Sequence, residues 1–480
     1  MRILAALLLL TSSVAGITLA AEEEKPEDGL SGLWTGVLSV GAQELPVEFQ
    51  FTALPGGQFA GNLKSPTQSP QPIPLTLVTF RNRELSASAG MIGGQFKGKV
   101  ASSGRTIRGD WTQGGVTLPL ELSYNPAGFQ PKRPQEPRPP FSYDSEEVTF
   151  ENELGGNRLA GTLTLPKDRR GALPAVVLIS GSGPQDRDET ILGHKPFAVI
   201  ADFLTRNGIA VLRYDDRGTG ASTGNFSYAT TLDFATDAAA AVTFLKNRPE
   251  VDPTKIGLIG HSEGGLVAPI VAVKRPGDVA FLVLLAAPGL RGDEILMTQS
   301  RALLSAAGMK PDLVDLMSRL NRSIYDALVL PDPNPETVRK LAAEFETEVK
   351  KLSPEDAKAL GEIGTVIEDQ MKSLQSPWFA QFLTLDPAEF LKKTTIPVLA
   401  LNGERDLQVL ADPNLAAISA HLTEAGNTHF ETKKLPELNH LFQRAATGLP
   451  GEYWRIETTI EPSVLKSILE WIQRTTSSKR

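Results

Sequence analysis

The sequence predicts an α/β fold class: a mostly parallel sheet with helices on both faces and a helical cap insertion, preceded by a small all-β domain. Residues 142–480 alternate apolar, strand-like stretches with helical stretches, as in sheets that are buried on both faces. Residues 29–124 consist of short stretches in which polar and apolar residues alternate, the period of half-buried strands. A proline-rich stretch, 125–141, separates the two and predicts a stiff linker whose basic residues are solvated.

Residues 1–20 predict a signal peptide that is cleaved after export. Arg2 precedes an apolar run from Ile3 to Leu10, and small residues continue to Ala20. An uncleaved membrane anchor would need about 20 apolar residues, and polar residues interrupt the run after Leu10. The chain has no cysteine, which excludes disulfides, a lipid-attachment thiol and a thiolate nucleophile. We therefore expect a secreted or periplasmic protein with no stable membrane anchor, and its net charge of -8 argues against nucleic acid as a partner.

Residues 29–124 repeat a short pattern that predicts a small antiparallel barrel or sandwich. Gly-Gly-Gln-Phe occurs twice, ending at Phe59 and at Phe96, and a bulky residue two positions before a glycine recurs in the stretches that contain Trp34 and Trp111. A glycine at such a position lets a strand bend while the aromatic residue faces the core. The domain has no histidine, so we expect packing rather than catalysis from it, and its ligand is left open.

The larger domain begins with two alternating segments, 146–152 and 157–166. Five apolar stretches follow as predicted parallel strands: 172–180, 208–216, 255–262, 281–289 and 396–406. Helical spacing of apolar residues between about 291 and 385 predicts a helical cap inserted between two strands of the sheet. In open sheets of this kind, sites form beyond the carboxyl ends of the strands, and each candidate residue below lies at such an end.

Gly260-His261-Ser262-Glu263-Gly264 matches the G-x-S-x-G pattern of a nucleophile elbow between a strand and a helix. The turn is so sharp that only glycine fits two positions before and after the serine. Ser262 then lies at a helix N-terminus, where backbone N–H groups favour the negative charge of acyl transfer. The alternative is a plain structural turn, and the flanking strand and helix favour the nucleophile.

A serine nucleophile needs a base and an acid that orients the base. Of the five histidines, we favour His440, in a loop after the predicted last strand, with His429 as the weaker alternative. The acid should lie between Ser262 and His440 in the chain. Asp406, just beyond a predicted strand, fits better than its competitor Glu404, because the loop must leave the strand before the acid can turn toward the histidine.

Acyl transfer also needs two N–H donors for the oxyanion. We expect the backbone of Glu263 and that of Ser182, the latter in the Gly-rich loop after the strand at 172–180, with a plain turn as the alternative reading of that loop. For the charged residues 186–188 we favour an ion pair that braces this loop, with a role in shaping the substrate pocket as the alternative. Residues 216–218 predict a structural turn with a buried charge pair, because they lack the pattern of a phosphate-binding loop.

From Glu146 to the C-terminus the chain resembles the α/β-hydrolase superfamily. The resemblance lies in SGSGPQDRDE, RYDDRGTG, GHSEGG, LNGERDLQV and NHLFQ, which are similar to motifs of its secreted bacterial serine-hydrolase branch, the carboxylesterases and serine aminopeptidase-like proteins. Some members carry a comparable β domain in front. The resemblance implies the same triad, Ser262, Asp406 and His440. Many relatives have histidine where Ser180 stands, which affects how the oxyanion loop is braced.

These features together predict an exported serine hydrolase that needs no cofactor and no metal. We expect a carboxylesterase for small to medium acyl esters, because an activated serine cleaves esters readily while amides require tighter control of the leaving amine. One alternative is an aminopeptidase-like serine peptidase on small peptides, which would need acidic side chains for the free amino group. The other is a non-catalytic envelope binding protein on a hydrolase scaffold.

Overall fold

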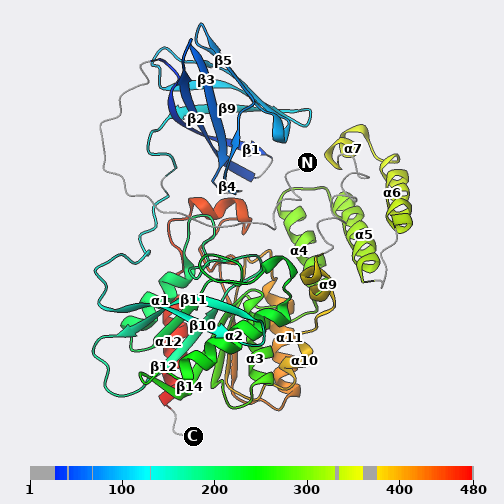
Figure 1. Cartoon of the computed structure of the whole chain (residues 1–480). Helices are drawn as coiled ribbons and strands as arrows, with labels where there is room; N and C mark the ends of the chain where they lie inside the picture. Colours follow the sequence, from blue (N-terminus) through cyan, green and yellow to red (C-terminus); the bar gives the residue numbers. More distant parts are fainter. Residues whose placement is uncertain are drawn as a thin grey trace. The chain divides into compact units, whose positions relative to one another are not determined.

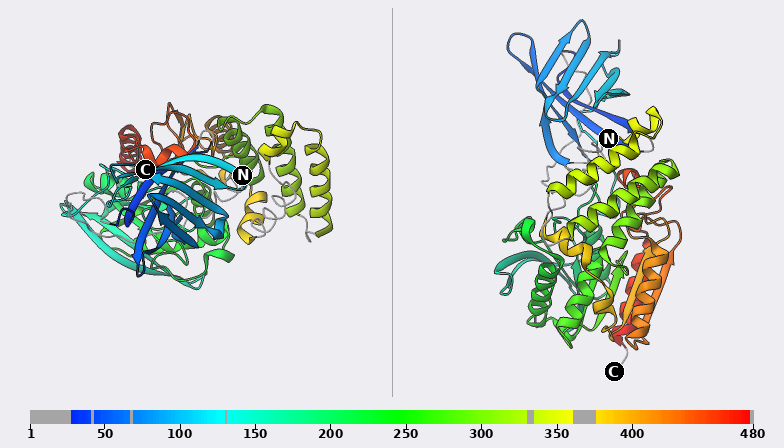
Figure 2. Two further views of the ribbon diagram at one scale, coloured as in Figure 1. Left: turned by 90° about the horizontal axis from the view of Figure 1, so that it is seen from above. Right: turned by 90° about the vertical axis from the view of Figure 1, so that its right-hand side faces the viewer.

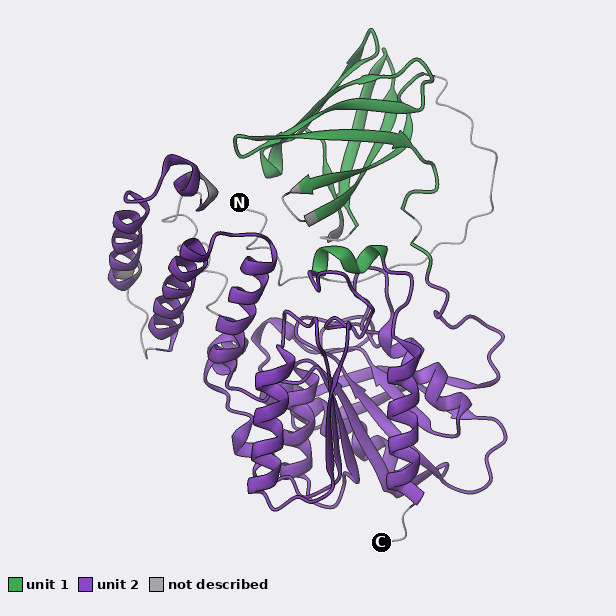
Figure 3. Ribbon diagram, turned by 180° about the vertical axis from the view of Figure 1, so that it is seen from behind, with its two compact units in different colours: residues 1–132, 450–455 green, residues 133–449, 456–480 purple. Residues whose placement is uncertain are grey.

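The computed structural model describes residues 28–40, 43–66, 69–129, 131–329, 335–360 and 376–477. It divides into two compact units, residues 1–132 with 450–455, and residues 133–449 with 456–480 (Figure 3). The predicted signal peptide, residues 1–20, lies outside the described residues. Within the part of the chain that is described, no helix is both long and apolar enough to cross a membrane.

The first unit is a nine-stranded antiparallel sheet that curls into a half-barrel, with strand order β4-β3-β2-β1-β9-β8-β7-β6-β5 (Figure 1). Trp34, Phe96 and Trp111 are buried in its core, as the sequence predicts. Phe59 of β3 meets Phe80 of β5 edge-on, with ring centroids 5.8 Å apart, so strands from opposite ends of the order approach each other. The strands are β1 (Gly32–Val40), β2 (Gln43–Leu54), β3 (Gln58–Ser65), β4 (Ser69–Pro74), β5 (Leu77–Arg81), β6 (Glu84–Ala89), β7 (Gly94–Val100), β8 (Thr106–Gln113) and β9 (Val116–Tyr124).

A short 3-10 helix from late in the chain, η3 (Pro450–Arg455), belongs to this first unit. Arg455 forms an ion pair with Glu44, and the ring of Trp454 packs against Phe129 at 5.7 Å. The first unit is therefore built from two separate parts of the sequence. Sequence patterns predict a continuous domain over residues 142–480, because nothing in the local composition of 450–455 differs from its surroundings.

The second half of the proline-rich stretch is packed onto the second unit. Arg133 is only 8% exposed and donates to the backbone carbonyls of Leu192, Gly193 and Ile456. Burial lowers the pKa of Arg133 to about 10, although nearby carboxylates oppose this. The expectation that the basic residues here are solvated is wrong for Arg133, because carbonyl groups far away in the sequence replace its water.

The second unit is an eight-stranded sheet with the order β10-β11-β13-β12-β14-β15-β16-β17. β10, β11 and β13 pair antiparallel, and every later neighbour is parallel, so the prediction of a mostly parallel sheet is confirmed. The strands are β10 (Tyr143–Asn152), β11 (Asn157–Pro166), β12 (Leu173–Ile179), β13 (Ala210–Tyr214), β14 (Val251–His261), β15 (Phe281–Leu285), β16 (Val398–Gly403) and β17 (Phe430–Leu435).

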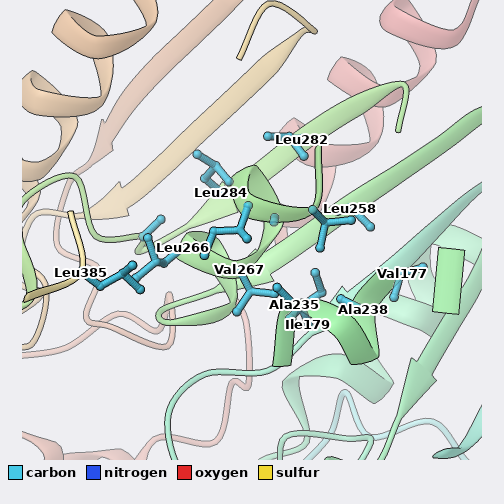
Figure 4. Close-up of a cluster of buried hydrophobic side chains, with 14 of the residues drawn as sticks. Val177, Ile179, Ala235, Ala238, Leu258, Leu266, Val267, Leu282, Leu284 and Leu385 are labelled. Atoms are coloured by element: carbon cyan, nitrogen blue, oxygen red, sulfur yellow. The ribbon is translucent and has the colours of Figure 1, made fainter. Parts of the chain in front are cut away.

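Helices cover both faces of this sheet, and β12 illustrates why its strands are apolar throughout. Val177 and Ile179 face the side covered by α2, α3 and α11, where Figure 4 shows them with residues of α2 and α3. Val176 and Leu178 face α1 and α12 on the other side. Alternate residues of a strand point to opposite faces, so a sheet covered on both needs apolar residues at every position. The helices are α1 (Pro196–Arg206), α2 (Thr231–Lys246), α3 (Gly264–Lys274), α10 (Ala388–Leu391), α11 (Ala411–Glu424) and α12 (Pro462–Ser477).

A helical insertion separates β15 from β16. In Figures 1 and 2 the helices α4, α5 and α6 lie side by side. Helices α5, α6, α7 and α9 each begin with a proline, which suits the first helical turn because it lacks an N–H. Asp293, near the start of α4, binds both Arg291 and Arg322, which joins α4 to α5. The helices are α4 (Gly292–Ala306), α5 (Pro311–Leu328), α6 (Pro335–Val349), α7 (Pro354–Leu360) and α9 (Pro377–Thr384).

Candidate active site

Ser262 lies in a sharp turn between β14 and α3. Its φ is +51°, a left-handed conformation that costs energy for a residue with a side chain. A Cβ at Gly260 would lie 2.0 Å from the backbone oxygen of Gly264, and a Cβ at Gly264 would lie 2.1 Å from that of Ile179. Both glycines are therefore required by the turn, which carries Ser262 out of the sheet at its carboxyl edge.

Asp406 and His440 meet at the same edge of the sheet. Asp406 follows β16 and His440 follows β17, and His440 Nδ1 donates to Asp406 Oδ2 at 2.8 Å. The second oxygen, Oδ1, accepts from the backbone N–H groups of Gln408 and Val409 at 2.8 and 2.9 Å. Both side chains are buried. The carboxylate is thus held by three hydrogen bonds in an orientation that presents one oxygen to the imidazole.

His261, the residue before the serine, is in direct contact with His440. His261 Nε2 donates to the backbone oxygen of His440 at 3.0 Å, and the two imidazole rings have centroids 4.8 Å apart. The structure therefore brings the sequence-predicted Ser262, Asp406 and His440 into one place.

The two alternatives left open by the sequence lie elsewhere. His429 precedes β17 and is exposed at the opposite edge of the sheet, where its backbone oxygen accepts from Val398. Glu404 is exposed, and its carboxylate accepts from the backbone N–H of Glu437. The position of β17 separates the two histidines, because residues before and after the strand lie at opposite edges of the sheet. The two acids lie at the same edge and differ in their partners, since Asp406 binds His440 and Glu404 binds the backbone of Glu437.

The loop after β12 passes directly against the serine. A Cβ at Gly181 would lie 3.1 Å from the Cβ of Ser262. The N–H of Gly181 is committed to Glu189 Oε1 at 2.7 Å. Within the described part of the chain, no hydrogen bond engages the backbone N–H of Ser182 or that of Glu263. The two N–H groups expected from the sequence thus have no other acceptor among the described residues.

The Glu263 side chain joins the elbow to the helical insertion. It is buried, and its Oε1 accepts from Thr231 Oγ1 and from Trp378 Nε1, each at 2.7 Å. Burial raises the pKa of the Glu263 carboxyl, and the hydrogen bonds from Thr231, Trp378 and Ser182 only partly oppose it. Sequence reasoning missed Trp378, since nothing around α9 distinguishes this tryptophan from a core residue.

Ion pairs brace the loop after β12, as the charged residues 186–188 suggest. Arg187 binds Asp215 at 2.8 Å, and Arg213 binds Asp188 at 2.7 Å. Ser180, at the start of the loop, donates its hydroxyl to Asp216 at 2.8 Å. A serine hydroxyl therefore anchors the start of the loop here.

The buried charge pair predicted around residues 216–218 involves a partner from outside that turn. Arg217 donates to Asp237 of α2 at 2.6 Å. Asp216 instead accepts from Ser180 and from the backbone of Gln185, and burial raises the pKa of its carboxyl well above the ordinary value. The turn links the loop after β12 to α2.

Residues 195–444 match the family model described as serine aminopeptidase, S33. The chain belongs to this family. It is 28% identical to esterase EstD of Thermotoga maritima over 337 residues, and this aligned region covers 69% of this chain and 68% of EstD. It is also 33% identical to the uncharacterized protein PA2218 of Pseudomonas aeruginosa, over 28% of this chain and 34% of the other. The family and the fold make the chain a hydrolase with the α/β-hydrolase fold.

Solved structures with the same fold have lower identity. The Pyrococcus furiosus esterase Pf2001 is 16% identical with a TM-score of 0.44, covering 72% of this chain and 99% of its own. Est1E of Butyrivibrio proteoclasticus with bound ferulic acid is 17% identical with a TM-score of 0.40, covering 69% and 100%. The proline iminopeptidase of Mycobacterium smegmatis is 17% identical with a TM-score of 0.41, covering 69% and 98%.

Proposed function

We propose that this protein is an exported serine esterase that cleaves small to medium carboxylic esters through an acyl-serine intermediate. The observation that carries the proposal is the buried Asp406–His440 hydrogen bond beside the strained turn that holds Ser262. Ionised Asp406 keeps the proton of His440 on Nδ1, so that Nε2 presents a lone pair to the serine hydroxyl.

The reaction then proceeds in two halves. Ser262 Oγ attacks the ester carbonyl carbon while its proton passes to His440 Nε2, and the N–H groups of Ser182 and Glu263 bind the oxyanion. Collapse of the tetrahedral intermediate expels the alcohol, which takes the proton from His440. Water repeats the sequence on the acyl-serine, and the carboxylic acid leaves with the serine restored.

Two observations support an ester as the substrate over a peptide with a free α-amino group. A relative that matches more than two-thirds of this chain is named an esterase. Glu263, the carboxylate nearest the serine in the chain, is already held by Thr231 and Trp378, which leaves it poorly placed to bind a charged α-amino group. The family description, serine aminopeptidase, keeps the peptidase as the second candidate.

The test is covalent labelling combined with substrate turnover. A fluorophosphonate probe should modify Ser262, located by peptide mass spectrometry. Ser262→Ala should abolish labelling and lower kcat for short-chain p-nitrophenyl esters by several orders of magnitude without unfolding the protein. Ser227→Ala, at an exposed serine of another turn, serves as the matched control.

Each other outcome points elsewhere. Turnover of aminoacyl-p-nitroanilides in place of esters would identify a peptidase. Failure of the wild-type protein to be labelled would favour a non-catalytic binding protein. The N-terminal sequence of the exported protein separately tests cleavage after Ala20.

A further inference from the structure

Glu189 is a deeply buried carboxylate that the proposed reaction does not use. It is 1% exposed and has a φ of +51°, in the loop that follows the oxyanion segment. Its Oε1 accepts two hydrogen bonds, from the backbone N–H of Gly181 at 2.7 Å and from His261 Nδ1 at 2.9 Å. Burial of an acidic side chain is costly unless it is paired, and a strained backbone adds to that cost. We therefore expect Glu189 to have a role that offsets these two costs.

His261 is bound by an acceptor at each ring nitrogen. Nδ1 faces Glu189 Oε1, which already accepts from Gly181, and Nε2 faces the backbone carbonyl oxygen of His440 at 3.0 Å. A neutral imidazole carries one N–H and would leave the other nitrogen's lone pair against an oxygen lone pair. Opposite an ionised Glu189, only an imidazolium, with a proton on both nitrogens, satisfies both contacts.

The groups that face His261 come from three separate loops. Glu189 lies beyond β12, Asp406 beyond β16, and the His440 ring beyond β17, together with the edge of Phe442 at a centroid distance of 6.5 Å. Burial acts to lower the pKa of His261, but Glu189, the His440 carbonyl and Asp406 outweigh it and raise the pKa above the ordinary value. Charge and hydrogen-bond geometry thus agree on a positive ring.

We propose that Glu189 and His261 form a carboxylate–imidazolium pair that positions the reacting groups on both sides of Ser262. On one side Glu189 fixes Gly181, and hence the next residue's oxyanion N–H. On the other side His261 fixes the backbone of His440. Both are positioning residues, since neither touches the acyl group. The inference rests on the proposed function, because it assigns these residues to the same reaction.

The geometry suggests a substitution that should break the pair with little change of shape. A single oxygen, Oε1, receives both N–H groups. In Glu189→Gln the carbonyl oxygen can take the place of Oε1 and accept from both N–H groups, while the amide nitrogen takes the place of Oε2, which has no hydrogen-bond partner among the described residues. The variant therefore keeps the shape of the pair and removes the negative charge that holds the second proton on His261.

The first test reads the protonation state directly and does not depend on activity. Selective ¹⁵N labelling of the five histidines should reveal one ring that keeps both nitrogens protonated at pH values above the ordinary titration range of histidine. That signal should vanish in His261→Gln and lose one proton in Glu189→Gln. A wild-type spectrum with no such ring overturns the inference, even if the variants fail to fold.

The second test is kinetic. Glu189→Gln should lower kcat for a p-nitrophenyl ester by about 10²-fold, the cost of a small misplacement of reacting groups, with KM changed less than about twofold because no substrate contact is lost. His261→Gln should do the same, and the double variant should lose no more than the worse single variant, since the two residues act as a unit. Additive losses, or an unchanged kcat, would contradict the positioning role.

A matched control removes a partly buried charge from the opposite edge of the sheet. Asp278 precedes β15 and binds Lys246 and Arg275, so Asp278→Asn should affect stability and leave kcat unchanged. The experiments also separate the two proposals. Activity that survives in Ser262→Ala overturns the serine mechanism and the positioning role together, whereas a missing imidazolium overturns the ion pair alone.

Discussion

The Asp406→Asn variant tests the proposed mechanism most sharply, because the structure dictates how the new amide must lie. Oδ1 of Asp406 accepts from the backbone N–H groups of Gln408 and Val409. The asparagine carbonyl oxygen must take this place, since an amide NH₂ there would face two donors. The NH₂ then points at His440 Nδ1, where Oδ2 lies at 2.8 Å in the wild-type protein.

This orientation forces His440 into the wrong tautomer. Nδ1 has to accept from the amide, so the ring proton moves to Nε2, which can no longer accept the proton of Ser262. In serine hydrolases with this triad, loss of the tautomer costs about 10⁴ in kcat, or about 5 kcal/mol of transition-state stabilisation at 1.36 kcal/mol for each factor of ten. The fold should survive, because each hydrogen bond keeps a donor and an acceptor.

The assay is steady-state hydrolysis of p-nitrophenyl butyrate, with thermal unfolding measured on the same samples. Asp412→Asn is the matched control, since that carboxylate is largely exposed and its ion pair with Lys434 lies on the surface. Its kcat should equal the wild-type value. An Asp406→Asn variant that is folded and keeps more than about a tenth of the wild-type kcat would refute the reasoning, because its ring would then hold the productive tautomer without the carboxylate.

Two further predictions concern stability. Trp378→Phe should lower the free energy of unfolding by about 1.5–3 kcal/mol, the range for a hydrogen bond to a charged group, because Glu263 loses one donor. In chemical denaturation the control Trp471→Phe should cost less, since the indole N–H of Trp471 donates no hydrogen bond within the described residues. Equal costs would argue against the hydrogen bond. Deleting residues 21–131 should leave a protein whose free energy of unfolding is higher, by at least about 3 kcal/mol, than that of a protein lacking 21–140. Only the longer deletion removes the buried hydrogen bonds of Arg133. Identical melting temperatures would show that these hydrogen bonds are dispensable.

Much of the fold follows from local patterns in the sequence. Continuous apolar runs predict strands covered on both faces because each side chain position then needs an apolar residue, and β12 and β14 lie where those runs place them. The elbow is equally local, since Gly260 and Gly264 are needed by a turn that spans only five residues. The order of serine, acid and histidine along the chain could also be predicted from the sequence, because each candidate follows a predicted strand.

The contacts between residues far apart in the chain depend on the tertiary structure. Strand register sends Asp406 and His440 to the serine and His429 to the other edge. Glu189 and His261 lie 72 residues apart, and Trp378 meets Glu263 across 115 residues. Local periodicity encodes the dihedral angles and burial of a segment, whereas a buried charge finds its partner only when packing brings distant loops together. The sequence by itself determined the elements and the elbow, and packing of the sheet edge determined which charged side chains surround it.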